Sequence, residues 1–216
     1  MALLAPSILS ADFAELGKEI ERTVRGGADW IHVDVMDGLF VPSISFGMPV
    51  IKSIRKTTDK PFDVHLMIEE PIRYIKEFKE SGADILTVHA EACSDTPKTL
   101  EEIKKAGMRP ALSIKPKTPV SDIEEYLPMT DMILVMSVEP GFGGQKLIPE
   151  TVEKVRQLRK IIDRKGFDVL IEIDGGINLD NVVSIAEAGT DVIVAGSAIF
   201  GEDTEGKTRA FSDLIR

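Results

Sequence analysis

Short apolar runs rich in Val and Ile recur along this chain, and a more polar segment follows each of them. Runs of this length and composition are typical of strands that are buried on both faces, as in a parallel sheet. We expect eight strands, at residues 4–9, 30–35, 62–67, 85–89, 110–114, 132–137, 169–173 and 192–196.

The segments between these runs have the spacing of amphipathic helices, and a glycine often closes them. Examples lie at residues 15–25, 71–81, 99–106, 150–165 and 179–188. Strand-then-helix repetition implies parallel strands with right-handed crossovers. An open doubly wound sheet is the alternative, but eight units allow the sheet to close. The pattern therefore predicts an α/β fold, a (β/α)₈ TIM barrel, as one catalytic domain over residues 1–216.

The composition and the net charge exclude several classes of binding partner and location. The net charge of −10 argues against nucleic acid or an anionic membrane surface as the main partner. No apolar run approaches the ~20 residues of a membrane span. The single cysteine, Cys93, excludes an intrachain disulfide and favours a reducing, cytoplasmic location. We expect Cys93 to be a small packed residue, not a catalytic thiol.

Polar residues occupy the expected C-terminal ends of several strands. His32 and Asp34 are two residues apart, so they project to the same face, and His65 and Asp174 end other strands. In a barrel these ends form the active-site rim. Two buried carboxylates require a cation or hydrogen bonds. His32, Asp34, His65 and Asp174 therefore form a candidate metal site.

Mixed nitrogen and oxygen ligands suit several divalent ions. They do not choose among Zn²⁺, Fe²⁺, Mn²⁺ and Co²⁺. Asp34 and Asp174 belong to strands on nearly opposite walls of an eight-stranded ring. They are candidate catalytic residues that remove a proton on one face of a substrate and return it on the other. The metal would stabilise the enediolate between these steps.

Glycine-rich turns follow the last three strands and predict a phosphate site, since glycine lets backbone N–H groups wrap an anion. The candidate residues are Gly141, Phe142, Gly143, Gly144, Gly175, Gly176, Gly196 and Ser197. Three methionines also fall near strand ends and are candidates for an apolar lining of the active site: Met36, Met67 and Met136. Taken singly, each such glycine is usually a tight turn and each methionine a core residue.

Seven motifs in order resemble the ribulose-phosphate 3-epimerase family. They are APSILS (5–10), HVDVMDG (32–38) with FVP (40–42), SFG (45–47), DVHLM (63–67), VEPGFGGQ (138–145), EIDGGI (172–177) and AGSAIF (195–200). The match runs over nearly the whole chain. Three positions depart from the usual family pattern: Lys117, Glu139 and the pair Lys146-Leu147. None is a proposed metal ligand.

The resemblance implies a barrel of the ribulose-phosphate-binding type that interconverts D-ribulose 5-phosphate and D-xylulose 5-phosphate in the pentose phosphate pathway. It implies one divalent ion per subunit, Zn²⁺ or Fe²⁺ foremost with Mn²⁺ or Co²⁺ as alternatives, held by the four ligands above. It also implies Asp34 and Asp174 as acid and base, and Ser7 and His65 in contact with substrate. The glycine-rich turns and Ser197 would hold the phosphate. A homo-oligomer, a dimer or a hexamer, is usual in the family.

Other functions remain open at this point. One is epimerisation of D-allulose 6-phosphate, although the paired glycines 175–176 and the Phe-Gly-Gly at 142–144 favour the pentose. Another is a non-catalytic sugar-phosphate or metal-binding protein. A sugar-phosphate decarboxylase would need a lysine beside the strand-end aspartates, and a Schiff-base aldolase would need a buried strand lysine. Lys115, at the end of the fifth strand, is the only near candidate for either role.

Overall fold

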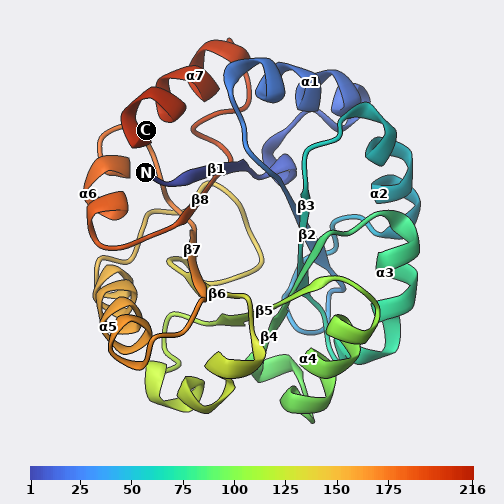
Figure 1. The fold of residues 1–216 in the computed structure, drawn as a ribbon. Coiled ribbons are helices and arrows are strands. Elements are labelled where there is room, and N and C mark those ends of the chain that lie inside the picture. The colour runs from blue at the N-terminus through green and yellow to red at the C-terminus, as the bar shows by residue number, and fades with distance from the viewer.

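The computed structural model describes all residues, 1–216, and contains one parallel sheet of eight strands. The strands are β1 (Leu3–Pro6), β2 (Ile31–Met36), β3 (Phe62–Met67), β4 (Ile85–His89), β5 (Arg109–Ile114), β6 (Met132–Met136), β7 (Leu170–Asp174) and β8 (Val192–Ala195). Each strand pairs with its neighbours in sequence, and β1 also pairs with β8. A parallel bridge between Ser7 and His32 joins β1 to β2, so the sheet closes into a ring (Figure 1).

Seven α-helices lie outside the ring and cover its outer face (Figure 1). They are α1 (Leu16–Gly26), α2 (Met48–Ile54), α3 (Ile75–Ser81), α4 (Thr96–Lys105), α5 (Glu150–Lys165), α6 (Val182–Glu187) and α7 (Thr204–Ile215). The TIM barrel expected from the sequence is confirmed by this arrangement.

The core divides between the two faces of the sheet because successive side chains alternate across a strand. Outward side chains such as Val33, Val64 and Ile171 pack against the helices in the main apolar cluster. A smaller apolar cluster fills one part of the barrel interior, with Trp30, Ile85 and Met132 among its members. Other interior positions carry the polar side chains of the candidate site, beside two further small apolar clusters that contain Met36, Met67 and Met136.

Three expected elements differ from the structure. The helix expected at residues 71–81 begins as a 3-10 helix, Pro71–Tyr74, and is α-helical only from Ile75 to Ser81. The first strand ends at Pro6 rather than continuing to residue 9, because Ile8–Ser10 form a 3-10 turn that bends the chain across the barrel mouth. The crossover after β5 has no α-helix but two 3-10 helices, Val120–Asp122 and Glu124–Met129. Pro128 lies inside the second of these and removes a backbone donor, which disfavours a longer helix.

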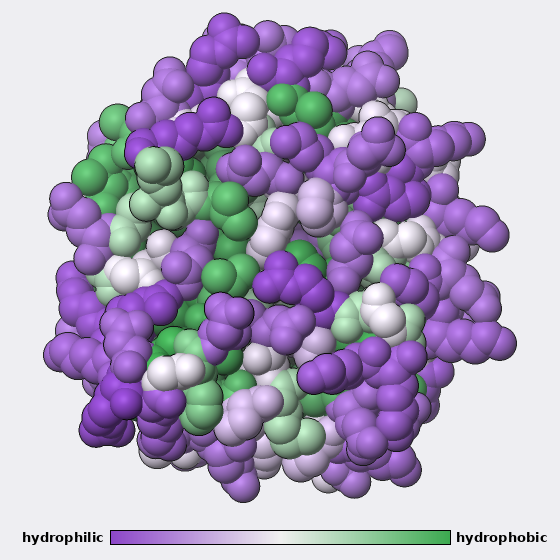
Figure 2. All heavy atoms as spheres, in the orientation of Figure 1, coloured by the Kyte–Doolittle hydropathy of each residue, from purple (hydrophilic) through white to green (hydrophobic).

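Hydrophilic residues cover most of the periphery of the visible face, with apolar patches closer to its middle (Figure 2). No helix in the structure combines the length and the apolar character that crossing a membrane would require.

The half-buried thiol of Cys93 follows a short 3-10 turn after β4. Burial raises its pKa to about 11, because the thiolate is poorly solvated there. Since the thiolate is the nucleophile, we expect iodoacetamide to alkylate the folded protein very slowly near neutral pH and much faster as the pH rises toward this pKa. The control is the same chain in denaturant. Equal alkylation rates in the folded and unfolded chains at neutral pH would contradict the prediction.

Candidate active site and metal centre

The register of β2 and β3 places four polar side chains side by side. His32 lies opposite Asp63, and Asp34 lies opposite His65, in this parallel pair. All four are buried. Because interior positions repeat every second residue, the alternation of polar and apolar residues in both strands gives the barrel a polar interior layer and an apolar outer face.

The side chains of His32, Asp34, His65 and Asp174 converge on one point. Asp34 Oδ1 lies 3.0 Å from His65 Nδ1 and 3.3 Å from His32 Nε2. Asp174 Oδ2, from β7, lies 4.0 Å from the same His32 nitrogen. One ligand atom from each of the four residues lies within 4.8 Å of each of the others. The four residues that the sequence nominated as metal ligands are thus brought together.

The donor chemistry of this group fits a divalent cation. His32 Nδ1 lies 2.6 Å from Asp63 Oδ2, so that nitrogen donates its proton to the carboxylate. Asp63 is itself held by the Thr87 hydroxyl at 3.2 Å. A neutral His32 ring therefore presents the lone pair of Nε2 to Asp34 Oδ1, and two lone pairs at that distance repel unless a proton or a cation lies between them.

The pKa values of His32 and Asp34 also show that positive charge is stabilised at this point. Burial favours neutral His32, but the charges of Asp34 and Asp63 outweigh it and raise its pKa well above the ordinary value. Burial likewise opposes ionisation of Asp34, yet when the ring nitrogens that face it carry protons, His32 and His65 hold the pKa of that carboxyl far below its usual range. A bound cation can supply the positive charge that a proton on His32 otherwise provides beside the Asp34 carboxylate.

Asp174 differs from Asp34 in its environment. Burial, together with the nearby charge of Asp34, raises the pKa of Asp174 to about 6. The Asp174 side chain is 16% exposed, whereas that of Asp34 is 4% exposed. Two carboxyl groups whose pKa values are moved in opposite directions are the usual arrangement for an acid and a base.

A third carboxyl lies deeper in the barrel. Glu172, two residues before Asp174, is fully buried, and neither of its oxygens has a hydrogen-bond partner. Its Oε1 lies 3.7 Å from His32 Nδ1. Burial and the charge of Asp63 raise the pKa of Glu172 well above its ordinary value, so this side chain adds little negative charge to the centre.

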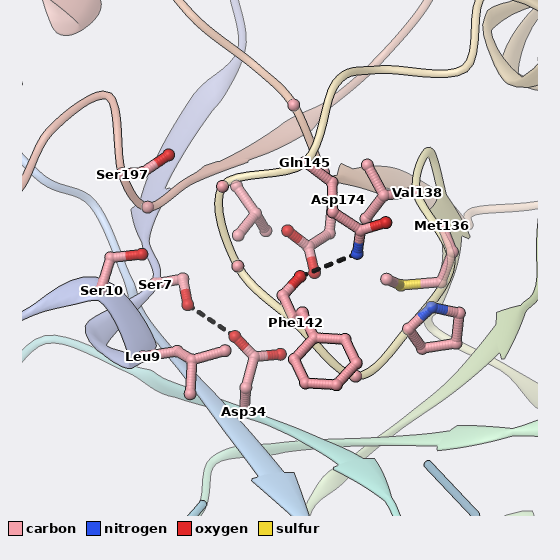
Figure 3. Close-up of a pocket in the computed structure, with 18 of the residues that line it drawn as sticks. Ser7, Leu9, Ser10, Asp34, Met136, Val138, Phe142, Gln145, Asp174 and Ser197 are labelled. Carbon is pink, nitrogen blue, oxygen red and sulfur yellow. Dashed lines mark hydrogen bonds between the residues drawn. The ribbon is translucent and has the colours of Figure 1, made fainter. Parts of the chain in front are cut away.

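A pocket of about 530 Å³, including its open mouth, lies at the C-terminal ends of the strands. Many of the residues nominated from the sequence line it: Ser7, Asp34, Met36, Met67, Met136, Gly141, Phe142, Gly143, Gly144, Asp174, Gly175, Gly176, Gly196 and Ser197. His32 and His65 are fully buried behind this lining. Figure 3 shows both carboxylates in the pocket, with Ser7, Ser10 and Ser197 on one side of them and Met136 on the other.

The Ser7 hydroxyl donates a hydrogen bond to Asp34 Oδ2 at 2.5 Å (Figure 3). The backbone N–H of Ser7 donates to the carbonyl of Ala195 in β8 at 3.0 Å, which holds the residue at the rim of the ring. Asp34 thus has one oxygen toward the histidines and the other bound by a hydroxyl that faces the pocket.

The glycine-rich turns pack directly against one another. Gly176 adopts a φ of +68°, and a Cβ at this position would lie 2.1 Å from the backbone nitrogen of Leu147. Only glycine permits this approach of the turn after β7 to the loop after β6. That loop is closed by Gln145, whose side-chain amide donates to the carbonyls of Glu139 and Phe142 at 2.7 and 2.9 Å.

Gly196 provides a test of the expected phosphate cradle. A Cβ on Gly196 would lie 2.6 Å from the Ser10 hydroxyl, so Gly196→Ala must displace that side chain. We expect KM for a sugar phosphate to rise about 10- to 100-fold, the cost of about one hydrogen bond to a charged group, with a smaller change in kcat. Gly47→Ala is the control, because its Cβ would meet nothing within 4 Å. Unchanged KM in folded Gly196→Ala would argue against a phosphate site there.

Sequence reasoning missed several residues of the site. Leu9, Val138 and Gln145 line the pocket but were not nominated, and Ser10, a polar residue at the expected end of the first strand, lines it too. Gln145 ends the glycine-rich motif after β6, and its place in that motif is the sequence signal that could have identified it as a site residue. Lys117, which departs from the usual family pattern, is exposed and lies outside the pocket lining.

Comparisons with known proteins agree with this geometry. The model of the ribulose-phosphate 3-epimerase family matches residues 3–200. A curated ribulose-phosphate 3-epimerase from Bacillus subtilis is 50% identical over 99% of this chain and 98% of its own length. One from Aquifex aeolicus is 47% identical over 100% of this chain and 97% of its own length.

Solved structures with low sequence identity share the fold alone. A 3-keto-L-gulonate-6-phosphate decarboxylase from Vibrio cholerae has a TM-score of 0.75 at 13% identity, over 99% of this chain and 97% of that one. A tryptophan synthase alpha-subunit from Pyrococcus furiosus has a TM-score of 0.73 at 17% identity, over 99% and 96% of the two chains. The family match and the relatives of nearly equal length establish that this chain is an isomerase of the ribulose-phosphate 3-epimerase family.

Proposed function

We propose that this chain interconverts D-ribulose 5-phosphate and D-xylulose 5-phosphate by two-base proton transfer at C3. One observation carries the proposal: Asp34 and Asp174 reach the same pocket from β2 and β7, which β1 and β8 separate in the ring. A substrate in this pocket meets a carboxyl group on each side of its C3 atom. That arrangement inverts a carbon centre, because a proton removed on one face is replaced on the other.

The two carboxyl groups also differ in their affinity for protons. Asp34 is ionised and accepts a proton, while the pKa of Asp174, about 6, is close enough to neutral pH for this group to take up and release one. The roles exchange when the reaction runs in the other direction. The Ser7 hydroxyl, which is hydrogen-bonded to Asp34 Oδ2, keeps that carboxylate oriented toward the pocket.

His32, Asp34, His65 and Asp174 are the residues that would hold a divalent cation. When bound, the cation would supply positive charge where negative charge develops on the substrate oxygens as the C3 proton leaves. Met36, Met67 and Met136 line the same part of the pocket and keep water away from it. This apolar lining strengthens the electrostatic interactions of the carboxylates.

The phosphate would lie at the glycine-rich end of the pocket. Backbone N–H groups of residues 175–176 and 196–197 and of the loop 141–144 line that end, where barrels commonly bind phosphate. We also propose that residues 1–216 act as one catalytic unit, since the pocket takes its lining from both ends of the chain.

The test is NMR of the metal-replete protein with D-ribulose 5-phosphate in D₂O. Formation of D-xylulose 5-phosphate with deuterium at C3 is the expected result. D-allulose 6-phosphate serves as the comparison substrate, and we expect it to react more slowly. Absence of both product and exchange, with ligand binding retained, would overturn the proposal in favour of a non-catalytic sugar-phosphate binding protein.

A further inference from the structure

His65 makes a second contact on the side facing away from Asp34. Its Nε2 lies 2.9 Å from Nε2 of His89, the last residue of β4, and both rings are fully buried. Two imidazole nitrogens at this distance share a single proton, so one ring donates and the other accepts. The tautomer of one histidine therefore determines the tautomer of the other.

Glu91 determines which ring donates. Its Oε2 lies 3.2 Å from Nδ1 of His89. Its Oε1 accepts a hydrogen bond from the backbone N–H of Lys115 at 2.8 Å and another from the Thr118 hydroxyl. These donors, together with His89, lower the pKa of Glu91 to about 2 despite its burial, so the group is an ionised acceptor.

The ionised Glu91 determines which ring nitrogen of His89 and of His65 carries a proton. A carboxylate accepts only, so His89 carries its proton on Nδ1 and presents a lone pair at Nε2. His65 must carry its proton on Nε2 to donate to that lone pair. In the neutral ring Nδ1 is then left with a lone pair directed toward Asp34 Oδ1, 3.0 Å away, where a metal ion shared by the two residues would lie.

We propose that Glu91 and His89 are positioning residues that keep the Nδ1 lone pair of His65 available to the metal ion. The inference rests on the proposed function, in which His65 is a metal ligand. Without the carboxylate of Glu91, His89 is free to carry its proton on Nε2 and donate to His65. His65 then keeps its proton on Nδ1 and donates to Asp34, so metal binding has to rearrange both rings.

The surroundings of Glu91 hold this chain of contacts rigidly. Lys154, from α5, donates to the carbonyls of Lys115 and Thr118 at 3.1 and 2.6 Å, which ties down the loop after β5. The ring of Phe40 packs against His89 with 4.8 Å between the ring centroids. The loop after β5 thereby contributes to the metal centre without contacting the metal.

The experiment measures divalent-metal affinity in protein stripped of metal, with Zn²⁺ titrated against a competing chelator and the Co²⁺ absorption spectrum as a second readout. We expect Glu91→Ala and His89→Leu to raise the Kd for Zn²⁺ about 10- to 100-fold, as is common for partners of metal-bound histidines. His89→Gln keeps an amide oxygen that accepts from His65 Nε2–H, so we expect its Kd to stay within about threefold of the wild type.

Glu70→Gln is the matched control. Glu70 also holds the segment after β4, through hydrogen bonds from the backbone and hydroxyl of Ser94, but it contacts neither histidine. We expect it to leave the Kd for Zn²⁺ unchanged.

The outcomes separate the two proposals. If wild-type protein binds no divalent metal, the metal part of the proposed function fails. If the wild type binds one ion and Glu91→Ala and His89→Leu bind it equally well, the positioning inference is overturned. If Glu91→Ala does not fold, the test is the comparison of His89→Leu with His89→Gln. Equal Kd values for Zn²⁺ in these two variants would overturn the positioning inference.

Discussion

Asp174→Asn is expected to lower kcat by about 10²- to 10⁴-fold, the range for loss of a general acid or base, while the barrel stays folded. The amide has the shape of the carboxyl group but cannot take or give the C3 proton. Asp174 is the last residue of β7 and lines the pocket, so the substitution leaves the apolar core unchanged. The measurement is kcat at saturating substrate with the metal content of the variant verified.

Isotope exchange makes this prediction specific to a two-base mechanism. In D₂O, Asp174→Asn retains Asp34, so we expect it to exchange the C3 proton of one epimer only, without forming the other. The control is Asp180→Asn, because Asp180 is exposed and outside the pocket lining. Near-normal kcat in metal-loaded Asp174→Asn, or exchange into both epimers, would exclude the assigned roles.

Removal of the divalent metal is expected to reduce activity to the background of the assay. A carboxylate such as Asp34 is a weak base toward a C–H bond, and it requires electrostatic stabilisation of the developing negative charge. We expect a strong chelator to abolish turnover and one added divalent ion per subunit to restore it. The measurement is activity against metal content, determined on the same sample.

A chelator control separates metal loss from unfolding. Circular dichroism of the stripped protein should retain the helical signal, since the main apolar cluster lies between sheet and helices and the four ligands lie inside the barrel. Full activity in protein verified to contain no metal would remove the cation from the mechanism.

The strand pattern was predictable because both faces of each strand are buried. β3 and β4 have the bounds expected from their apolar runs, and α5 has those expected from its periodicity. In β2 and β3 the polar residues recur with period two, and this periodicity alone predicts that His32, Asp34 and His65 share the inner face.

Other features depended on contacts between distant segments. The turn that ends β1 at Pro6 forms where the chain bends across the mouth of the closed ring, which an apolar run alone does not signal. Asp63 and Glu91 each resemble an ordinary polar residue in the sequence. Their roles follow from the histidines that face them, at 2.6 Å from His32 and 3.2 Å from His89.

The sequence by itself determined the eight-stranded parallel barrel, the rim that carries the site and the four candidate ligands, because periodicity and strand-end position are local properties. Only the tertiary structure decided the distances among those ligands, the opposite pKa shifts of Asp34 and Asp174, and the chain of contacts from His65 through His89 to Glu91. These depend on burial and on side chains that meet across different strands, since desolvation and Coulomb energy are set by three-dimensional surroundings rather than by sequence neighbours.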